Sequence, residues 1–162
     1  MSRVHSLARS LVSALAALGV AAYGAAALVT VADVIGRTVD MPVQGVVDLV
    51  QLFVVTGAWL VMPYAFMTGA HVGVDFVINS LPKASRVPLQ LFAAAVALVL
   101  VGLMLWYGFE TFNVRSMFGD RSQQLGIPVA WYWYPLLVGL TVSLLGVVLE
   151  TVATLQRVSR HE

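Results

Sequence analysis

The charged residues of this chain fall in clusters, and four long stretches between the clusters carry no charge at all. The uncharged stretches are 10–32, 49–70, 87–109 and 129–149. A helix that crosses a bilayer needs roughly 20 consecutive apolar residues, and a charge within the hydrocarbon is costly. Each stretch is long enough to cross, and each is apolar on nearly all sides. The sequence therefore predicts an all-α membrane protein with four transmembrane helices.

Composition excludes several other classes of protein. The 162 residues are 60% hydrophobic and 10% charged, whereas soluble domains carry about 25% charged residues. A net charge of +1 is too balanced to attract nucleic acid. Without cysteine there is no disulfide or thiolate metal site. Phosphate-loop, nucleophile-elbow and zinc-helix motifs do not occur, so we expect no enzyme, no cofactor and no metal.

The predicted spans are about 10–35, 46–68, 87–110 and 129–150, within a single integral membrane domain over residues 1–162. The first span resembles a secretory signal at its start, but it is longer than a signal core, and we interpret it as a retained helix. Lysine and arginine are more frequent on the side of the two termini and the middle connection. Both termini are therefore expected in the cytoplasm.

Several apolar positions suggest how the helices lie. The aromatic residues Trp106, Trp131 and Trp133 are expected at the membrane interface, where they anchor helices in lipid. Apolar residues at 74–81 predict a short interfacial helix between spans two and three. Pro63 is expected inside the second helix. Pro135 either kinks the fourth helix or lies in its first turn, with the aromatic residues in a segment before the helix.

Small residues recur every four positions in the first span, a spacing that lets helix backbones approach closely in lipid. They are Ser13, Ala17, Ala21 and Ala25. The pairs Ala93 with Ala97 and Gly139 with Ser143 repeat the spacing. These stripes are candidate faces for helix contact.

Two clusters at helix ends are candidate sites. Asp33 and Arg37 are spaced to pair on one helical face, and we expect Asp48, at the start of the second helix, to bridge the intervening loop toward them. A solvated loop with incidental charges is the alternative. At the cytoplasmic end, His71 and Asp75 follow the second span, and they are interpreted chiefly as local structural hydrogen-bonding residues.

In order along the chain, four segments resemble the small membrane subunit of tripartite ATP-independent periplasmic (TRAP) transporters, the DctQ-type family. The segments are Asp33 to Arg37, Pro42 through Asp48 to Leu49, Gly69 to Asp75, and Leu125 to Pro128 followed by Trp131 and Tyr132. One departure is Asp48, where the family often has glutamate. The resemblance covers nearly the whole chain.

The resemblance implies a three-protein importer of organic acids that uses an ion gradient and lies in a bacterial inner membrane. In that scheme this chain is a scaffold subunit whose partners are a large membrane subunit, a periplasmic substrate-binding protein and membrane lipids. Asp33, Arg37 and Asp48 would serve assembly or docking at the outer face. The main alternative is a self-contained homo-oligomeric transporter or channel, and a structural subunit of an unrelated membrane complex is the third possibility. The substrate, coupling ion and stoichiometry do not follow from the sequence.

Overall fold

A computed structural model describes residues 2–68 and 83–159 of the chain. Four helices make up most of this part, and they span α1 Ser2–Thr38, α2 Val46–Met67, α4 Lys83–Phe118 and α5 Ala130–Ser159. All four are long and apolar enough to cross a membrane, which confirms the predicted all-helical fold with four candidate spans. The predicted interfacial helix, His71 and Asp75 lie outside the described residues.

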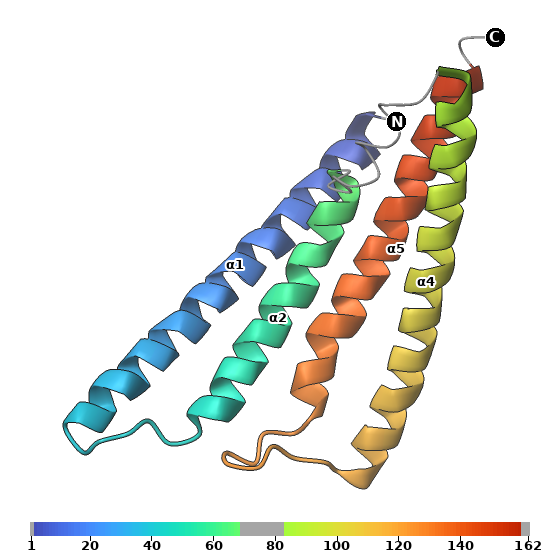
Figure 1. Cartoon of the computed structure of the whole chain (residues 1–162). Coiled ribbons are helices and arrows are strands. Elements are labelled where there is room, and N and C mark those ends of the chain that lie inside the picture. The colour runs from blue at the N-terminus through green and yellow to red at the C-terminus, as the bar shows by residue number, and fades with distance from the viewer. Residues whose placement is uncertain (1, 69–82, 160–162) are drawn as a thin grey trace.

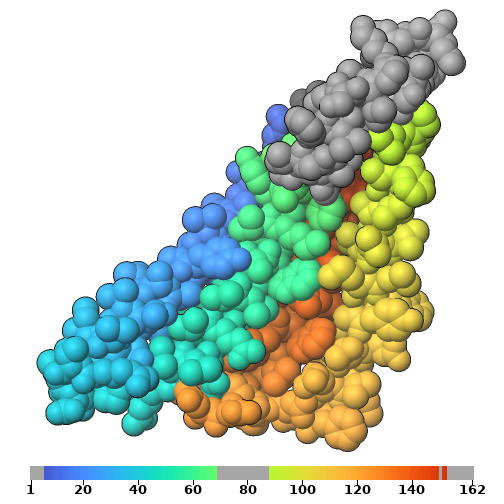
Figure 2. Space-filling view, in the orientation of Figure 1, coloured from blue at the N-terminus to red at the C-terminus, as the bar shows by residue number. Residues whose placement is uncertain are grey.

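The helices form a single layer in the order α1, α2, α5, α4 (Figure 1). The main helix contacts are between α1 and α2, between α2 and α5, and between α5 and α4. Figure 2 shows all four helices at the surface of one face. The two ends of the chain lie at the same end of the layer. The layer therefore consists of two helical hairpins, α1 with α2 and α4 with α5, joined along α2 and α5.

Glycines allow the closest helix approaches within this layer. A Cβ atom on Gly19 would lie 2.9 Å from the carbonyl oxygen of Gly57, and one on Gly57 would lie 3.0 Å from that of Gly19. The α1 and α2 backbones therefore meet at this pair, as small residues permit in lipid. Between the hairpins, Gly139 of α5 lies directly against the Trp59 carbonyl of α2.

The buried line of α1 differs from the predicted stripe. Val12, Gly19, Ala26 and Asp33, seven residues apart in succession, are buried. By contrast, Ser13, Ala17 and Ala21 are exposed, and Ala25 is half-buried. The predicted contact face of α1 is therefore wrong within this chain, because α2 packs on an adjacent face centred on Gly19. Gly139 and Ser143 of α5 are buried, as a contact face requires, and Ala93 and Ala97 are half-buried.

α1 and α4 extend beyond the uncharged stretches at both ends, and the C-terminal end of α4 is capped at a special backbone position. After α4, Gly119 has a φ of +65°. Its N–H bonds to the Ser116 carbonyl and the Asp120 N–H bonds to the Arg115 carbonyl, which is a Schellman cap. Pro135 is the sixth residue of α5, so the aromatic residues belong to the helix rather than to a segment before it.

Candidate functional site at the distal end

The end of the layer opposite the chain termini carries the polar contacts that tie the helices together, and we call it the distal end. It consists of the loops 39–45 and 119–129 with the adjoining helix ends, at the bottom of Figure 1. The residues predicted as an outer assembly or docking site all lie here. Each of the two buried carboxylates, Asp33 and Asp48, contacts a different loop.

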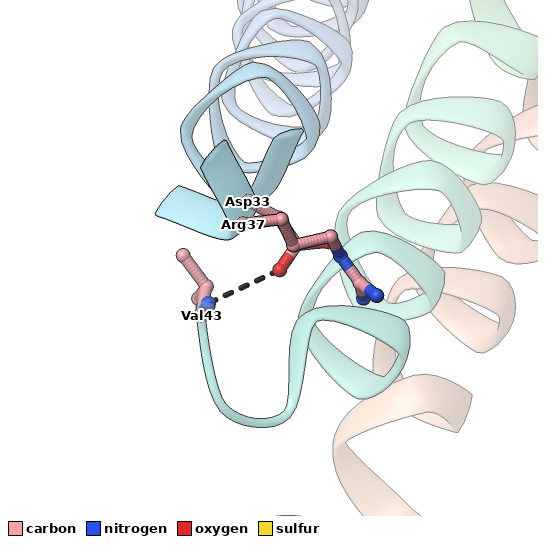
Figure 3. Close-up of polar contacts among 3 residues, drawn as sticks. All are labelled: Asp33, Arg37 and Val43. Carbon is pink, nitrogen blue, oxygen red and sulfur yellow. Dashed lines mark hydrogen bonds and ion pairs between the residues drawn. The ribbon is translucent and has the colours of Figure 1, made fainter. Parts of the chain in front are cut away.

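Asp33 fastens the first loop to α1. One carboxylate oxygen accepts a hydrogen bond from the Val43 N–H at 3.1 Å, and the other contacts the Arg37 Nε at 2.8 Å (Figure 3). Asp33 is buried while the Arg37 side chain is 65% exposed. The spacing of four residues along α1 brings the pair together, as the sequence indicated. The carboxylate therefore has a loop partner and an ionic partner at once.

Asp48 joins the two hairpins. It lies in the first turn of α2 and is 4% exposed. Its Oδ2 atom accepts hydrogen bonds from the backbone N–H groups of Gln124 and Leu125, at 2.9 and 2.7 Å. The expectation that Asp48 bridges the first loop toward Asp33 and Arg37 is therefore wrong. The carboxylate faces the α4–α5 loop because α5, not α1, lies beside that face of α2.

Two further contacts beside Asp48 hold the α4–α5 hairpin against the α1–α2 hairpin. The Tyr132 hydroxyl donates to the Asp48 backbone carbonyl at 3.0 Å. Gly45, with a φ of +73°, lies directly against the Leu125 side chain, and a Cβ atom would overlap that side chain. Glycine is needed here for two reasons: the backbone is left-handed, and the Leu125 side chain leaves no room for a Cβ atom. The contacts of Asp48, Tyr132 and Gly45 together form what we call the hairpin clamp.

The α4–α5 loop is also closed by its own hydrogen bonds. The Ser122 N–H donates to the Ile127 carbonyl at 2.8 Å, and the Ile127 N–H donates to the Ser122 hydroxyl at 2.9 Å. Gly126 has a φ of +66° inside this turn. These bonds present the Gln124 and Leu125 N–H groups side by side to Asp48. The loop is thus preorganised to bind a carboxylate of the other hairpin.

Sequence reasoning missed Gly45 and Ser122, and it named Tyr132 only within the family resemblance, without its contact to Asp48. The turn signal of Leu125 to Pro128 marked the loop, but nothing in the chain indicated which carboxylate the loop contacts. That pairing depends on the neighbour relation between α2 and α5, which are separated in the sequence by α4 and its connections.

The aromatic residues predicted at the interface extend over the distal half of α4 and α5. Trp106 and Trp131 are largely exposed on the surface of the layer, and Trp133 is half-buried. Tyr134 stacks in a tilted contact with Phe112 of α4, with ring centroids 5.6 Å apart. This ring contact helps to join α4 to α5. The membrane-anchoring role of the tryptophans stays a prediction.

The carboxylates of the distal end bind backbone N–H groups and form ion pairs. These contacts hold the fold together. Among residues 2–68 and 83–159, no group of three or more His, Cys, Asp or Glu side chains is placed to hold a metal ion. The fold and this site define a multi-pass membrane protein whose polar groups organise the connections between its helices.

The chain belongs to the DctQ component family of tripartite ATP-independent periplasmic transporters, whose family model it matches over residues 26–157. The match extends from the middle of α1 to near the end of α5, so it includes both loops of the distal end. A search of curated proteins found no match. Membership in the family makes the chain a component of a multi-subunit membrane transporter.

Proposed function

We propose that this chain is the scaffold subunit of an ion-gradient-driven importer of organic acids, located in a bacterial inner membrane. It packs against the large membrane subunit that moves the substrate. Its distal end faces the periplasm and contributes to the surface on which the substrate-binding protein docks. Family membership supports the place in a transporter. The scaffold role is argued from the geometry of the layer and of the hairpin clamp.

The observation that carries the proposal is the fixing of both distal loops by buried carboxylates. Asp33 fastens the first loop and Asp48 fastens the second. A docking surface benefits from loops that are already ordered, because ordering on binding reduces affinity. The polar network therefore suits an end that other proteins contact repeatedly.

The shape of the layer also supports a scaffold. A layer one helix thick leaves both broad faces of α1 and α4 available to lipid or to a neighbouring subunit. Large apolar side chains are exposed along α1 and α4, including Leu18 and Leu28 on α1 and Phe92 and Val99 on α4. Such faces suit packing against other transmembrane helices.

A test of the distal site begins with co-expression of this chain, its large subunit and its binding protein. We expect Arg37→Ala to reduce the yield of the purified complex or the affinity of the binding protein. The effect is modest, because an exposed ion pair contributes only about 0 to 1 kcal/mol. The matched control is Arg115→Ala, which removes an exposed arginine paired with Asp120 at the same end. Equal complex yield and equal binding for the two variants would refute the role of Arg37.

Asp48→Ala provides a stronger test, since it opens the clamp between the hairpins. We expect the complex to assemble less or to bind its periplasmic partner less tightly. Asp120→Asn is the control, because it removes a carboxylate of the same end whose side chain pairs only with exposed Arg115 among the residues described. If Asp48→Ala supports uptake and docking as well as Asp120→Asn does, the clamp has no part in function.

The alternative of a self-contained transporter is tested with the chain alone. Reconstituted without the large subunit, the chain should give no gradient-driven uptake of organic acids into liposomes. Uptake that is lost on Asp33→Asn would instead establish the homo-oligomeric transporter and overturn the scaffold proposal.

A further inference from the structure

Ser143 is a fully buried polar side chain in the contact between α2 and α5. It is 0% exposed, and its hydroxyl makes no hydrogen bond to a residue in the described part of the chain. Elsewhere on α5, the Thr141 and Thr151 hydroxyls each donate to the carbonyl four residues earlier, at 2.7 Å. Ser143 does not follow this pattern. A buried hydroxyl without a partner costs roughly 1 to 3 kcal/mol, so the site calls for a ligand.

The facing helix carries a backbone carbonyl that needs a donor. Pro63 lies inside α2 and is fully buried. Proline has no N–H, so it cannot donate to the carbonyl of Trp59, four residues earlier. In membrane helices, carbonyls freed in this way are bonded again by neighbouring serine or threonine side chains or by ordered water. The Trp59 carbonyl is therefore a candidate acceptor inside the layer.

The register of the two helices brings this donor and this acceptor to one place. Gly139 of α5 lies directly against the Trp59 carbonyl. Further along α5, Gly146 lies against the Met67 side chain of α2. Ser143 lies between these two contacts and one turn beyond Gly139, which places it at the level of the α2 turn that contains Pro63. The Ser143 hydroxyl makes no direct hydrogen bond to the Trp59 carbonyl, so a link between the two needs an intervening water molecule that accepts from one and donates to the other.

We infer that one buried water molecule bridges the Ser143 hydroxyl and the Trp59 carbonyl, at a specific site between the two hairpins. A buried water needs at least two polar partners, and this site supplies them. The water completes the hydrogen bonding of α2 beside Pro63 and gives the apolar contact between α2 and α5 one polar link. Such a bridge is independent of the transport role proposed above.

Carbonyl NMR of the full-length chain in bilayers tests the inference. Trp59 is followed by Leu60, whereas Trp106, Trp131 and Trp133 are each followed by tyrosine. Carbonyl-¹³C tryptophan with ¹⁵N leucine therefore gives a single carbonyl–nitrogen signal, which belongs to Trp59. We expect Ser143→Ala to move this carbonyl resonance upfield, because a hydrogen bond is lost. The control Thr141→Val should leave the resonance unchanged.

Two further measurements complete the test. Magnetisation transferred from water should reach the Trp59 carbonyl in the natural chain and fail to reach it in Ser143→Ala. In a Pro63→Ala background, the new N–H satisfies Trp59, so adding Ser143→Ala should cause no further shift. An unchanged Trp59 resonance in Ser143→Ala would overturn the inference. A shift without transfer from water would also overturn it, in favour of a direct hydrogen bond formed by a rotated serine.

Discussion

Gly139→Ala tests the contact on which the joining of the two hairpins depends. A Cβ atom at this position would lie 2.8 Å from the carbonyl carbon of Trp59 and closer still to its oxygen. The obstacle is backbone, which cannot rotate away as a side chain can. The two helices must therefore separate by enough to lose packing along their contact.

The expected size of this effect follows from two opposing contributions. Overpacking of a well-packed interior costs about 1 to 3 kcal/mol, and a backbone obstacle puts this site near the upper value. Alanine is better than glycine within a helix by about 1 kcal/mol, which offsets part of the cost. The net loss is about 2 kcal/mol. At about 1.4 kcal/mol for each factor of ten, the folding equilibrium changes about 30-fold.

The assay is reversible unfolding of the purified chain in mixed micelles, followed by far-ultraviolet circular dichroism over a denaturing-detergent titration. Gly102→Ala is the matched control, because a Cβ atom at Gly102 of α4 meets nothing within 4 Å. This control should match or exceed the stability of the natural chain. If Gly139→Ala is as stable as Gly102→Ala, the close approach of α5 to Trp59 does not exist and α5 packs on α2 in a different register.

Three other substitutions have defined outcomes in the same unfolding assay. Gly45→Ala should lower the stability of the chain more than Gly119→Ala does. Both positions have positive φ angles, but only Gly45 also lies against another side chain. Equal losses of stability in the two variants would argue against the Leu125 contact. Gly57→Ala should lower stability by about 1 to 3 kcal/mol through its contact with the α1 backbone. Gly24 faces open space, so Gly24→Ala should leave stability unchanged or raise it. An unchanged stability in Gly57→Ala would contradict the α1–α2 crossing. Asp33→Ala should lower stability by about 1 to 3 kcal/mol, because it leaves the Val43 N–H without its acceptor. Asp33→Asn should lower stability less, since the amide oxygen still accepts from Val43, and the opposite ranking would exclude that bond.

The fold was predictable from the sequence because lipid imposes a simple rule. A helix must be apolar over the thickness of the bilayer, so the distribution of charge alone located four helices. Their ends were harder to predict, because they depend on caps. Asp40, a residue other than glycine with a φ of +57°, follows α1, and nothing about aspartate at that position specified the turn.

Contacts near in sequence were predictable, and contacts between distant segments were not. The pairing of Asp33 with Arg37 follows from helical spacing. The pairing of Asp48 with the loop at 124–125 does not, because hydrophobic patterning leaves the order of the helices in the layer undetermined. The small-residue stripe of α1 failed for a related reason. Alanine is so frequent in this helix that its spacing does not identify the face that Gly19 and Gly57 bring together.

The layer also has a consequence for how this chain is assembled from parts. Each hairpin is closed by its own short loop and its own helix crossing, and in the described part of the chain the two hairpins meet chiefly through α2, α5 and the loops at one end. A break between residues 68 and 83 would therefore sever no helix of the described chain. The two fragments, expressed separately, should recombine in the membrane into a native pair, and Asp48→Ala should weaken that recombination.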